Sequence, residues 1–216
     1  PLAGGTARYA VDAAWRVPHF EKMLSDNVQL LPRWAEAWRR GGDPTFLSAA
    51  RSTFAWLEAE MRLPGGGYAT ALDADSETAD GRHEEGAFYA WTGRDFDAAV
   101  TGRLGADEAP FARAAFGVAE VGPFEGRNVL RHAAGPSELA ERFDLSPAEA
   151  EARLERLRQE LLAARAERPR PARDDKELTG LQGLAILGLA RAGRLLGDAR
   201  MKGRARELAD HVLRVM

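Results

Sequence analysis

The strongest structural signal in this chain lies in Val17-Pro18-His19-Phe20-Glu21-Lys22-Met23-Leu24-Ser25-Asp26-Asn27. From this stretch a stripe continues at helical spacing, made of Phe20, Met23, Leu24, Asn27, Leu30, Leu31, Trp34, Ala37 and Trp38. His19 stands at the start of the stripe and Asn27 lies on it. Burying an unpaired polar group costs roughly 2–7 kcal/mol, so a core helix normally keeps such groups off its buried side. Residues 17–27 therefore read both as a helix start and as a candidate functional site.

Apolar periodicity predicts about eight helices of uneven length along the whole chain. The clearest are expected at 19–40, 44–62, 94–104, 107–116, 147–168, 177–196 and from 199 onward. Pro32 should kink the first helix, because proline removes a backbone donor and crowds the preceding turn. Asp43, Ser146 and Asp198 are expected to cap the helices that follow them.

A smaller amount of strand is also expected. The pattern predicts two short strands at 68–72 and 87–91, joined by a polar excursion over 73–86, and a brief strand at 128–130. The fold class is therefore mainly α with a short β-hairpin insertion.

An internal repeat relates the two ends of the chain. The pattern helix, Gly-Asp, helix over 20–61 recurs 155 positions later over 175–216, so that Gly42-Asp43 corresponds to Gly197-Asp198. Asn27 corresponds to Gln182 at the same point of the repeat. Two helical hairpins of matching length, each with a polar residue at the matching buried position, predict an array of α-hairpins.

Bulk composition narrows the possible functions. A net charge of −3 offers no basic surface for nucleic acid, and 45% apolar residues are ordinary for a globular protein. The chain has no cysteine, which excludes disulfides and suits a reducing compartment, so a cytoplasmic location is expected. The longest apolar run, 184–190, is far shorter than the roughly 20 residues of a membrane span. We expect one domain over 1–216, with no membrane or nucleic-acid partner.

Several motifs together resemble the YyaL-like, spermatogenesis-associated, thioredoxin-domain-containing proteins. They fall in order as Gly4-Gly5, Arg8-Tyr9, Val17 to Leu24, Asp26-Asn27, Asp73-Ala74-Asp75-Ser76, Glu85-Gly86, Phe88-Tyr89, Trp91-Thr92, Phe124-Glu125-Gly126, Asn128-Val129-Leu130, Arg173 to Lys176, Leu178-Thr179-Gly180 and Gly183-Leu184. The resemblance implies an (α/α)6 toroid like that of six-hairpin glycosidases. Full members combine such a toroid with a thioredoxin-like domain, so this chain is expected to be an incomplete toroid that works with that domain.

The chain departs from the family pattern at three places. Ser25 stands where tyrosine is usual, Leu181-Gln182 where Trp-Asn is usual, and Thr6 where phenylalanine is usual. Aromatic faces stack on apolar ligand surfaces. These departures therefore weigh against a sugar-stacking platform at those positions.

His19 is the first candidate catalytic residue. At a helix N-terminus the positive end of the helix dipole would favour the neutral imidazole, which can act as a general base. The alternative is a structural histidine that fixes the entry of the helix. Asp26 is a candidate acid–base residue, and Glu21 is a candidate for ligand binding.

Asp73 and Asp75 form the second candidate. They leave a strand end two residues apart, so both can face one side and could divide into an acid and a base. With Glu77 and Glu84 they also resemble a calcium loop, although position six of such a loop should be glycine and is Thr78. A solvated turn capped by side-chain hydrogen bonds is the plain alternative.

Asp174 and Asp175 form the third candidate, with Lys176 beside them as a ligand-binding residue. Two carboxylates at a helix start are favoured by capping and by the helix dipole alone. The functional alternative is a carboxylate pair that faces the same cavity as His19, because Lys176 corresponds to Glu21 in the repeat.

Further ligand-binding candidates are Arg8, Tyr9, Asn27 and Gln182; a structural pair of Arg8 with Asp12 is the alternative for the first of these. No histidine spacing indicates zinc, and no cofactor is indicated. The sequence thus predicts acid–base chemistry on a sugar-like small molecule. The alternative is a non-catalytic interaction domain that works with a thioredoxin-like domain.

Overall fold

The computed structural model describes residues 2–78 and 80–215, and it is mainly helical, as expected. Its contacts divide into two compact units. Unit 1 consists of residues 1–2, 9–19 and 75–170, and unit 2 of residues 3–8, 20–74 and 171–216. The prediction of a single toroidal domain stays a prediction.

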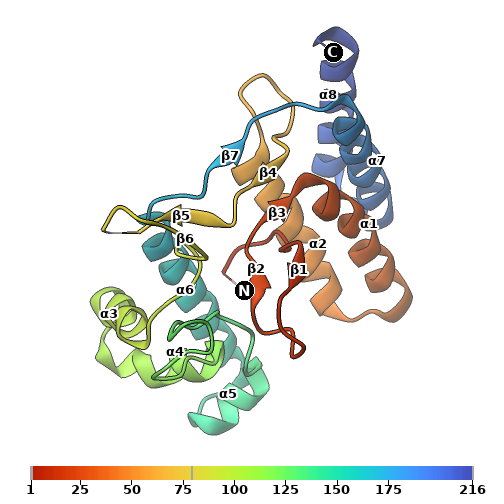
Figure 1. The fold of residues 1–216 in the computed structure, drawn as a ribbon. Helices are drawn as coiled ribbons and strands as arrows, with labels where there is room; N and C mark the ends of the chain where they lie inside the picture. The colour runs from red at the N-terminus through yellow and green to blue at the C-terminus, as the bar shows by residue number, and fades with distance from the viewer. Residues whose placement is uncertain (1, 79, 216) are drawn as a thin grey trace. The chain divides into compact units, whose positions relative to one another are not determined.

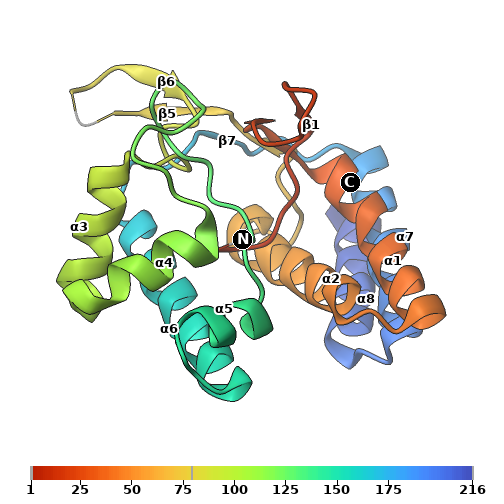
Figure 2. The same ribbon diagram turned by 90° about the horizontal axis from the view of Figure 1, so that it is seen from below.

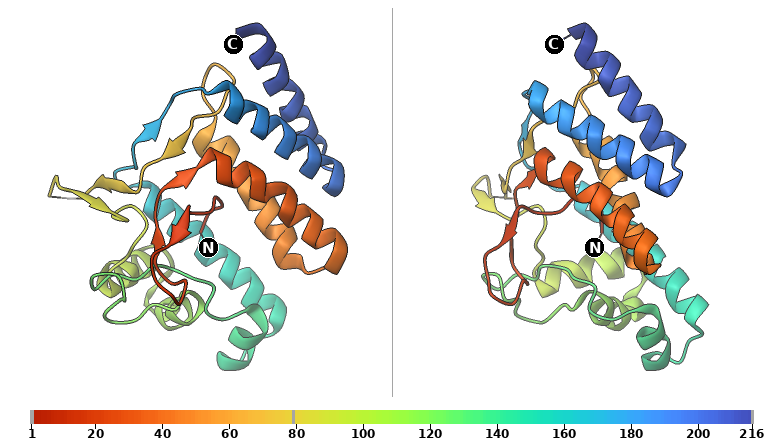
Figure 3. Two further views of the ribbon diagram at one scale, coloured as in Figure 1. Left: turned by 45° about the vertical axis from the view of Figure 1, so that its right-hand side comes forward. Right: turned by 90° about the vertical axis from the view of Figure 1, so that its right-hand side faces the viewer.

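Unit 2 contains the two helical hairpins of the repeat. The first is α1 (Leu24–Gly41) with α2 (Pro44–Trp56), and a π-helical turn (Leu57–Met61) extends α2. The second is α7 (Thr179–Leu196) with α8 (Ala199–Val215). The helices α1 and α7 pack against each other and join the hairpins (Figure 1), and Figure 3 shows the same four helices from two other sides.

The contact between α1 and α7 is close enough to require glycine. A Cβ atom at Gly188 of α7 would lie 2.2 Å from the backbone oxygen of Val28 in α1. Around this contact lie fully buried apolar side chains, including Leu24, Leu31, Leu57, Met61, Leu189, Met201 and Leu208. The core of unit 2 therefore depends on two helix backbones in direct contact.

A small antiparallel sheet lies at one end of these helices. It is formed by β3 (Lys22–Met23), β4 (Ala71–Leu72) and β7 (Arg173–Asp174), with β4 in the centre. Further backbone bonds lengthen it: Leu24 N–H donates to Thr70, Thr70 N–H to Asp174, and Asp73 N–H to Ala172. Three segments far apart in the sequence thus meet along one ladder.

In its described residues, unit 1 contains two short hairpins and four α-helices. The hairpins are β1 (Tyr9–Ala10) with β2 (Pro18–His19), and β5 (Asp75–Glu77) with β6 (His83–Glu85). The helices are α3 (Gly93–Leu104), α4 (Ala109–Phe116), α5 (Pro136–Arg142) and α6 (Pro147–Ala166), and a 3-10 turn (Ala106–Glu108) precedes α4. Figure 2 shows α3 to α6 gathered together. Their core includes Phe96, Phe111, Phe116, Leu139 and Leu157.

Most helix limits were predicted well because their caps are local. Asp43, Thr92 and Ser146 accept backbone hydrogen bonds at the starts of α2, α3 and α6. Asp198 does the same for α8, since its Oδ1 accepts from the backbone N–H groups of Arg200 and Met201. The helix α5 was not predicted.

Two helix starts were predicted wrongly. The first helix begins at Leu24, so His19 lies in β2 and not at a helix N-terminus. Similarly, α7 begins at Thr179, which leaves Asp174 in β7 and Asp175 in the loop that follows. In both cases the residues expected at the helix start, or in the turn that caps it, instead form a strand or the loop next to it. The short strands β3 and β7 pair with β4, far away in the sequence, which helical periodicity does not reveal.

The predicted strand at 87–91 was also wrong. This apolar segment is a turn, and the real strands of the hairpin lie inside the excursion that was expected to be irregular. Three carbonyl groups of the segment, at Ala87, Phe88 and Ala90, accept from the guanidinium of Arg168 in place of a strand neighbour. Of the predicted strand at 128–130, only a bridge between Trp91 and Asn128 forms.

The close contact at Gly188 predicts opposite effects for two glycine substitutions in the same helix. Gly188→Ala should lower the free energy of unfolding by about 1–3 kcal/mol, because the new Cβ atom meets backbone that cannot move aside. Gly183→Ala meets nothing within 4 Å and should raise it by about 0.5–1 kcal/mol. Urea unfolding of both variants tests this; equal effects would contradict the close packing of α1 on α7.

The cap of α8 predicts a pH dependence. Burial raises the pKa of Asp198, but its backbone hydrogen bonds and Arg200 outweigh this and leave the pKa below its usual value. A lowered pKa stabilises the fold above the unfolded-state pKa, and this contribution is lost as pH falls through the folded value. Asp198→Ala should therefore cost about 1 kcal/mol at pH 7 and much less near pH 2. A cost that is the same at both values in thermal unfolding would refute the capping role.

Candidate functional site

His19 is part of a small polar cluster in unit 1. Its Nδ1 atom lies 2.8 Å from Oε1 of Glu85, and its ring stacks on Tyr9 with centroids 4.8 Å apart. The pairing of Tyr9 with His19 between β1 and β2 creates this stack. A histidine whose Nδ1–H donates to a carboxylate carries its lone pair on Nε2, which is the arrangement of an oriented general base.

A second carboxylate joins this cluster through the β5–β6 hairpin. Asp75 is directly opposite Glu85 in the register, so the two side chains lie on the same face. His19, Tyr9 and Asp75 are thus predicted site residues that the structure brings together.

Glu85 is the member of this cluster that sequence reasoning missed. Its position in the Glu85-Gly86 motif was visible, but nothing local indicated a partner 66 positions earlier. The glycine at position 86 was a weak sequence signal for a turn, and in the structure it adopts a positive φ of 70° directly after β6. Only the pairing of β5 with β6 reveals which way Glu85 faces.

Unit 2 contains a separate group of predicted residues along its sheet. Continuing the β3–β4–β7 register by one residue places Glu21, Asp73 and Asp174 on one face, and Lys22, Arg173 and Asp175 on the other. Asp73 is exposed and Asp174 is half-buried. Three carboxylates from distant segments therefore share the first face.

Cations accompany several of these carboxylates. Arg8 lies 3.0 Å from Glu21, and Lys176 lies 3.1 Å from Asp174. The predicted alternative partner of Arg8, Asp12, instead accepts backbone hydrogen bonds in the turn between β1 and β2. On the opposite face, Arg173 binds Asp175 and holds the pKa of that carboxyl below its usual value. Asp175 is thus separated from Asp174 by the alternation of the strand.

The expected pair of Asp73 and Asp75 is divided between the units, with Asp73 in unit 2 and Asp75 in unit 1. Asp26 lies in the first turn of α1; its Oδ2 atom is buried and has no hydrogen-bond partner within residues 2–78 and 80–215. The predicted convergence of all these groups with His19 on one cavity stays a prediction.

Asn27 and Gln182 have a clear positioning role. The carboxamide of Asn27 accepts from Thr6 N–H at 2.6 Å and donates to Thr6 C=O at 3.0 Å. Gln182 makes the same two bonds with Tyr68, at 3.0 and 2.7 Å. The two residues correspond in the repeat and are fully buried, so each fastens one extended segment to the start of its helix.

Comparison with known proteins places the chain in a family. No family model matches it. Human spermatogenesis-associated protein 20 is 32% identical over 213 residues, which cover 91% of this chain and 27% of the human protein. The rat protein of the same name is 29% identical over 98% of this chain, and so is an uncharacterized protein of Caenorhabditis elegans.

The chain belongs to the spermatogenesis-associated protein 20 family. It spans less than a third of the length of the curated relatives it matches. Where it departs from the family pattern at position 182, glutamine still makes the carboxamide-to-backbone pair. At position 6 only the backbone of the threonine meets Asn27, so a phenylalanine side chain is not needed for that contact.

The described residues contain neither a group of side chains that could hold a metal ion nor a helix that could span a membrane. Within 2–78 and 80–215, no three His, Asp or Glu side chains are grouped so that they could hold a metal ion. None of the helices in this part of the chain combines the length and apolar character needed to cross a bilayer.

The positioning role of Gln182 predicts a large loss of stability on truncation. Gln182→Ala leaves the N–H and C=O groups of Tyr68 buried without partners, at about 1–3 kcal/mol each, so the free energy of unfolding should fall by roughly 2–4 kcal/mol. Gln29→Ala removes an exposed amide from α1 and should change it by less than about 0.5 kcal/mol. Chemical denaturation measures both, and a Gln182 variant as stable as the Gln29 variant would contradict this role.

Proposed function

We propose that this protein performs acid–base chemistry on a sugar-like small molecule, with His19 as the proton acceptor. The observation that carries the proposal is the hydrogen bond of His19 to Glu85 beneath a stacked Tyr9. His19 and Glu85 are both partly exposed, with 26% and 41% of their side chains accessible. A substrate hydroxyl or a carbon-bound proton could therefore reach the imidazole.

Asp75 is the proposed proton donor of the same unit. It faces the same side of the hairpin as Glu85, which is the hydrogen-bond partner of His19. Tyr9 would hold the plane of the imidazole and offer an apolar face to a sugar ring. In this proposal Glu85 orients the base and does not itself touch the substrate.

The carboxylate face of unit 2 is proposed to bind hydroxyl groups. Carboxylates accept hydrogen bonds from adjacent hydroxyls, which suits a polyol. Asp73 and Asp174 are the proposed contacts, with Arg8, Glu21 and Lys176 setting their charge. Because Asp175 lies on the other face and is bound by Arg173, Asp175→Asn is the matched control for Asp174→Asn.

The test uses a panel of aldoses, ketoses and uronic acids at millimolar concentration, with binding followed by calorimetry and turnover by proton NMR. We expect at least one sugar to bind and to react. Turnover should be lost in His19→Gln and Glu85→Ala, while His83→Gln, which replaces an exposed histidine of the same hairpin, should keep it. The proposal fails if no sugar binds, or if His19→Gln reacts like the unaltered protein.

A non-catalytic interaction domain is the second candidate. It is favoured by the engagement of Asn27 and Gln182 with backbone groups and by the missing aromatic residues at positions 6, 25 and 181. The partner in this case is a thioredoxin-like domain of the kind that the family resemblance implies. His19→Gln, Asp73→Asn and Asp174→Asn should then leave its affinity unchanged, and loss of affinity in all three would argue against a simple scaffold.

A further inference from the structure

A groove of about 700 Å³ lies in unit 1 between α3, the end of α6 and the turn 87–91. We call it the α3–α6 groove. Its volume falls in the range of roughly 300–1,000 Å³ that small-molecule sites occupy. Much of its wall consists of small residues, among them Ala90, Ala98, Gly102 and Ala164. Such a wall leaves room for an apolar body.

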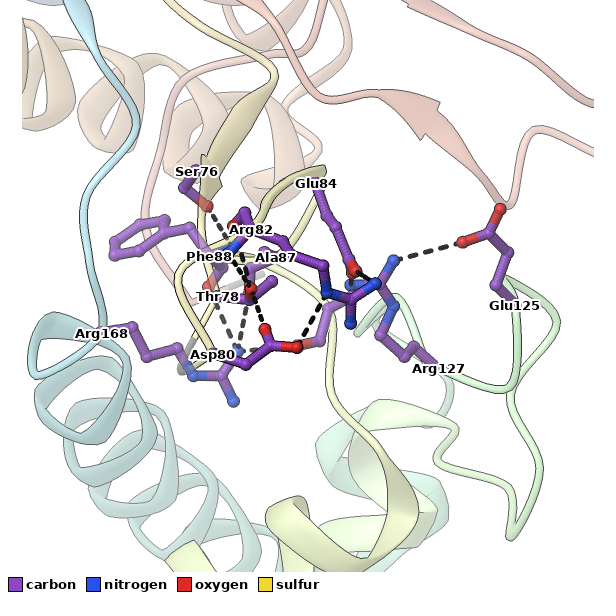
Figure 4. Close-up of polar contacts among 11 residues, drawn as sticks. Ser76, Thr78, Asp80, Arg82, Glu84, Ala87, Phe88, Glu125, Arg127 and Arg168 are labelled. Atoms are coloured by element: carbon purple, nitrogen blue, oxygen red, sulfur yellow. Dashed lines mark hydrogen bonds and ion pairs between the residues drawn. The ribbon is translucent and has the colours of Figure 1, made fainter.

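Arg168 lies in the wall of this groove just after α6. Its Nη1 atom donates to the carbonyl groups of Ala87, Phe88 and Ala90, the last at 2.7 Å. Its guanidinium lies 3.6 Å from the centre of the Trp91 ring. Figure 4 shows the side chain reaching from α6 toward the turn that precedes α3. One edge of the guanidinium is therefore fixed by backbone carbonyls and one face by an aromatic ring.

The other edge of this guanidinium is unused. Within residues 2–78 and 80–215, the Nε and Nη2 groups of Arg168 donate to no acceptor, and no carboxylate lies within ion-pair distance of it. The two other arginines of the groove differ, because Arg103 binds Glu167 and Arg127 binds Glu84 and Glu125. Nε and Nη2 form the side-on fork that matches carboxylate and phosphate oxygens.

The charge of Arg168 favours an anionic ligand beside it. Burial lowers the pKa of Arg168 to about 10, so the side chain is still protonated at neutral pH. Asp95 favours the charged form from a distance and Arg165 opposes it. A half-buried charge without a counter-ion is costly, and a bound anion would relieve that cost. The buried indole N–H of Trp91, which has no acceptor within the described residues, is a second unused donor in the same wall.

We propose that the α3–α6 groove binds a small molecule that carries a phosphate or carboxylate group on an apolar body. The anionic group lies on the Nε and Nη2 fork of Arg168, and the apolar body lies along the alanines of α3 and α6. This site shares no residue with the His19 cluster, so it stands or falls independently of the proposed catalytic function.

The experiment titrates the protein with phenyl phosphate, benzoate and neutral benzyl alcohol, and follows amide chemical shifts of residues 90–103 by NMR. We expect saturable shifts with one or both anions at millimolar concentration and none with the alcohol. Which anion binds more tightly identifies the phosphate or the carboxylate as the recognised group. Absence of saturable binding by both anions overturns the proposal.

Single substitutions can distinguish a loss of ligand binding from a loss of folding. Arg168→Gln should weaken binding about tenfold or more, the value of one charge-assisted hydrogen-bond pair, whereas Asp95→Asn should strengthen it by removing a competing negative charge. Because a Cβ atom at Gly102 meets nothing within 4 Å, Gly102→Leu should fold normally and fill the groove.

Gly203→Leu is the matched control, because it places the same side chain at an open position of α8. We expect binding to be lost in Gly102→Leu and kept in Gly203→Leu. If the folded Gly102→Leu variant binds phenyl phosphate or benzoate as tightly as the Gly203→Leu variant, the anion lies elsewhere and the proposal is wrong.

Discussion

The structure of unit 2 depends on the backbone ladder in which β4 pairs with β3 on one side and with β7 on the other. Each strand is only two residues long, and such short pairs have little stability alone. The helices supply what the strands lack, because Asn27 fastens Thr6 to α1 and Gln182 fastens Tyr68 to α7. The close contact of α1 with α7 then fixes both helix starts together.

Unit 1 contains the same kind of hydrogen-bond pair between a buried carboxamide and the backbone of one residue. Asn128 is buried, and its carboxamide accepts from Ala119 N–H and donates to Ala119 C=O, at 2.9 and 3.0 Å. Each of the buried carboxamides in the described chain, those of Asn27, Asn128 and Gln182, thus both accepts from and donates to the backbone of one residue. Buried amides are stable only when their donors and acceptors are satisfied. In this protein the buried carboxamides also satisfy the backbone N–H and C=O groups of irregular segments. These segments can therefore pack against helices without leaving buried polar groups unpaired.

This arrangement explains how much the sequence could predict. Caps and hairpin lengths depend on neighbours in the chain, so Asp43, Ser146 and the repeat of two helical hairpins were predicted correctly. The exact start of α1 and the setting of Asp174 depend on partners more than 40 residues away. Apolar periodicity predicts that the helix begins near Phe20, because periodicity carries no information about the pairing of Lys22 and Met23 with residues 71 and 72. The turn at 87–91 was misread for the same reason, since Arg168 supplies its hydrogen bonds.

The candidate site was predicted with the same limits. His19, Asp75 and Tyr9 were proposed as site residues from residue type and motif, and strand pairing brings them close together in unit 1; their functional roles stay a prediction. Glu85, which orients His19, could not be assigned because its partner is set by hairpin register. The resemblance to the spermatogenesis-associated proteins supplied the family, which the curated relatives confirm; the toroid that it implies stays a prediction. The resemblance did not point to Arg168, which has no carboxylate within ion-pair distance among the described residues.

Hydrogen exchange of individual backbone amides tests the central claim that these short ladders fix the polar segments. The amides of Leu24, Thr70 and Asp73 each donate across the ladder, to Thr70, Asp174 and Ala172 respectively. The account predicts that they exchange as slowly as core amides of α7, and that Gln182→Ala speeds them together. Rapid exchange of these three amides in the unaltered protein, while α7 stays protected, would contradict it.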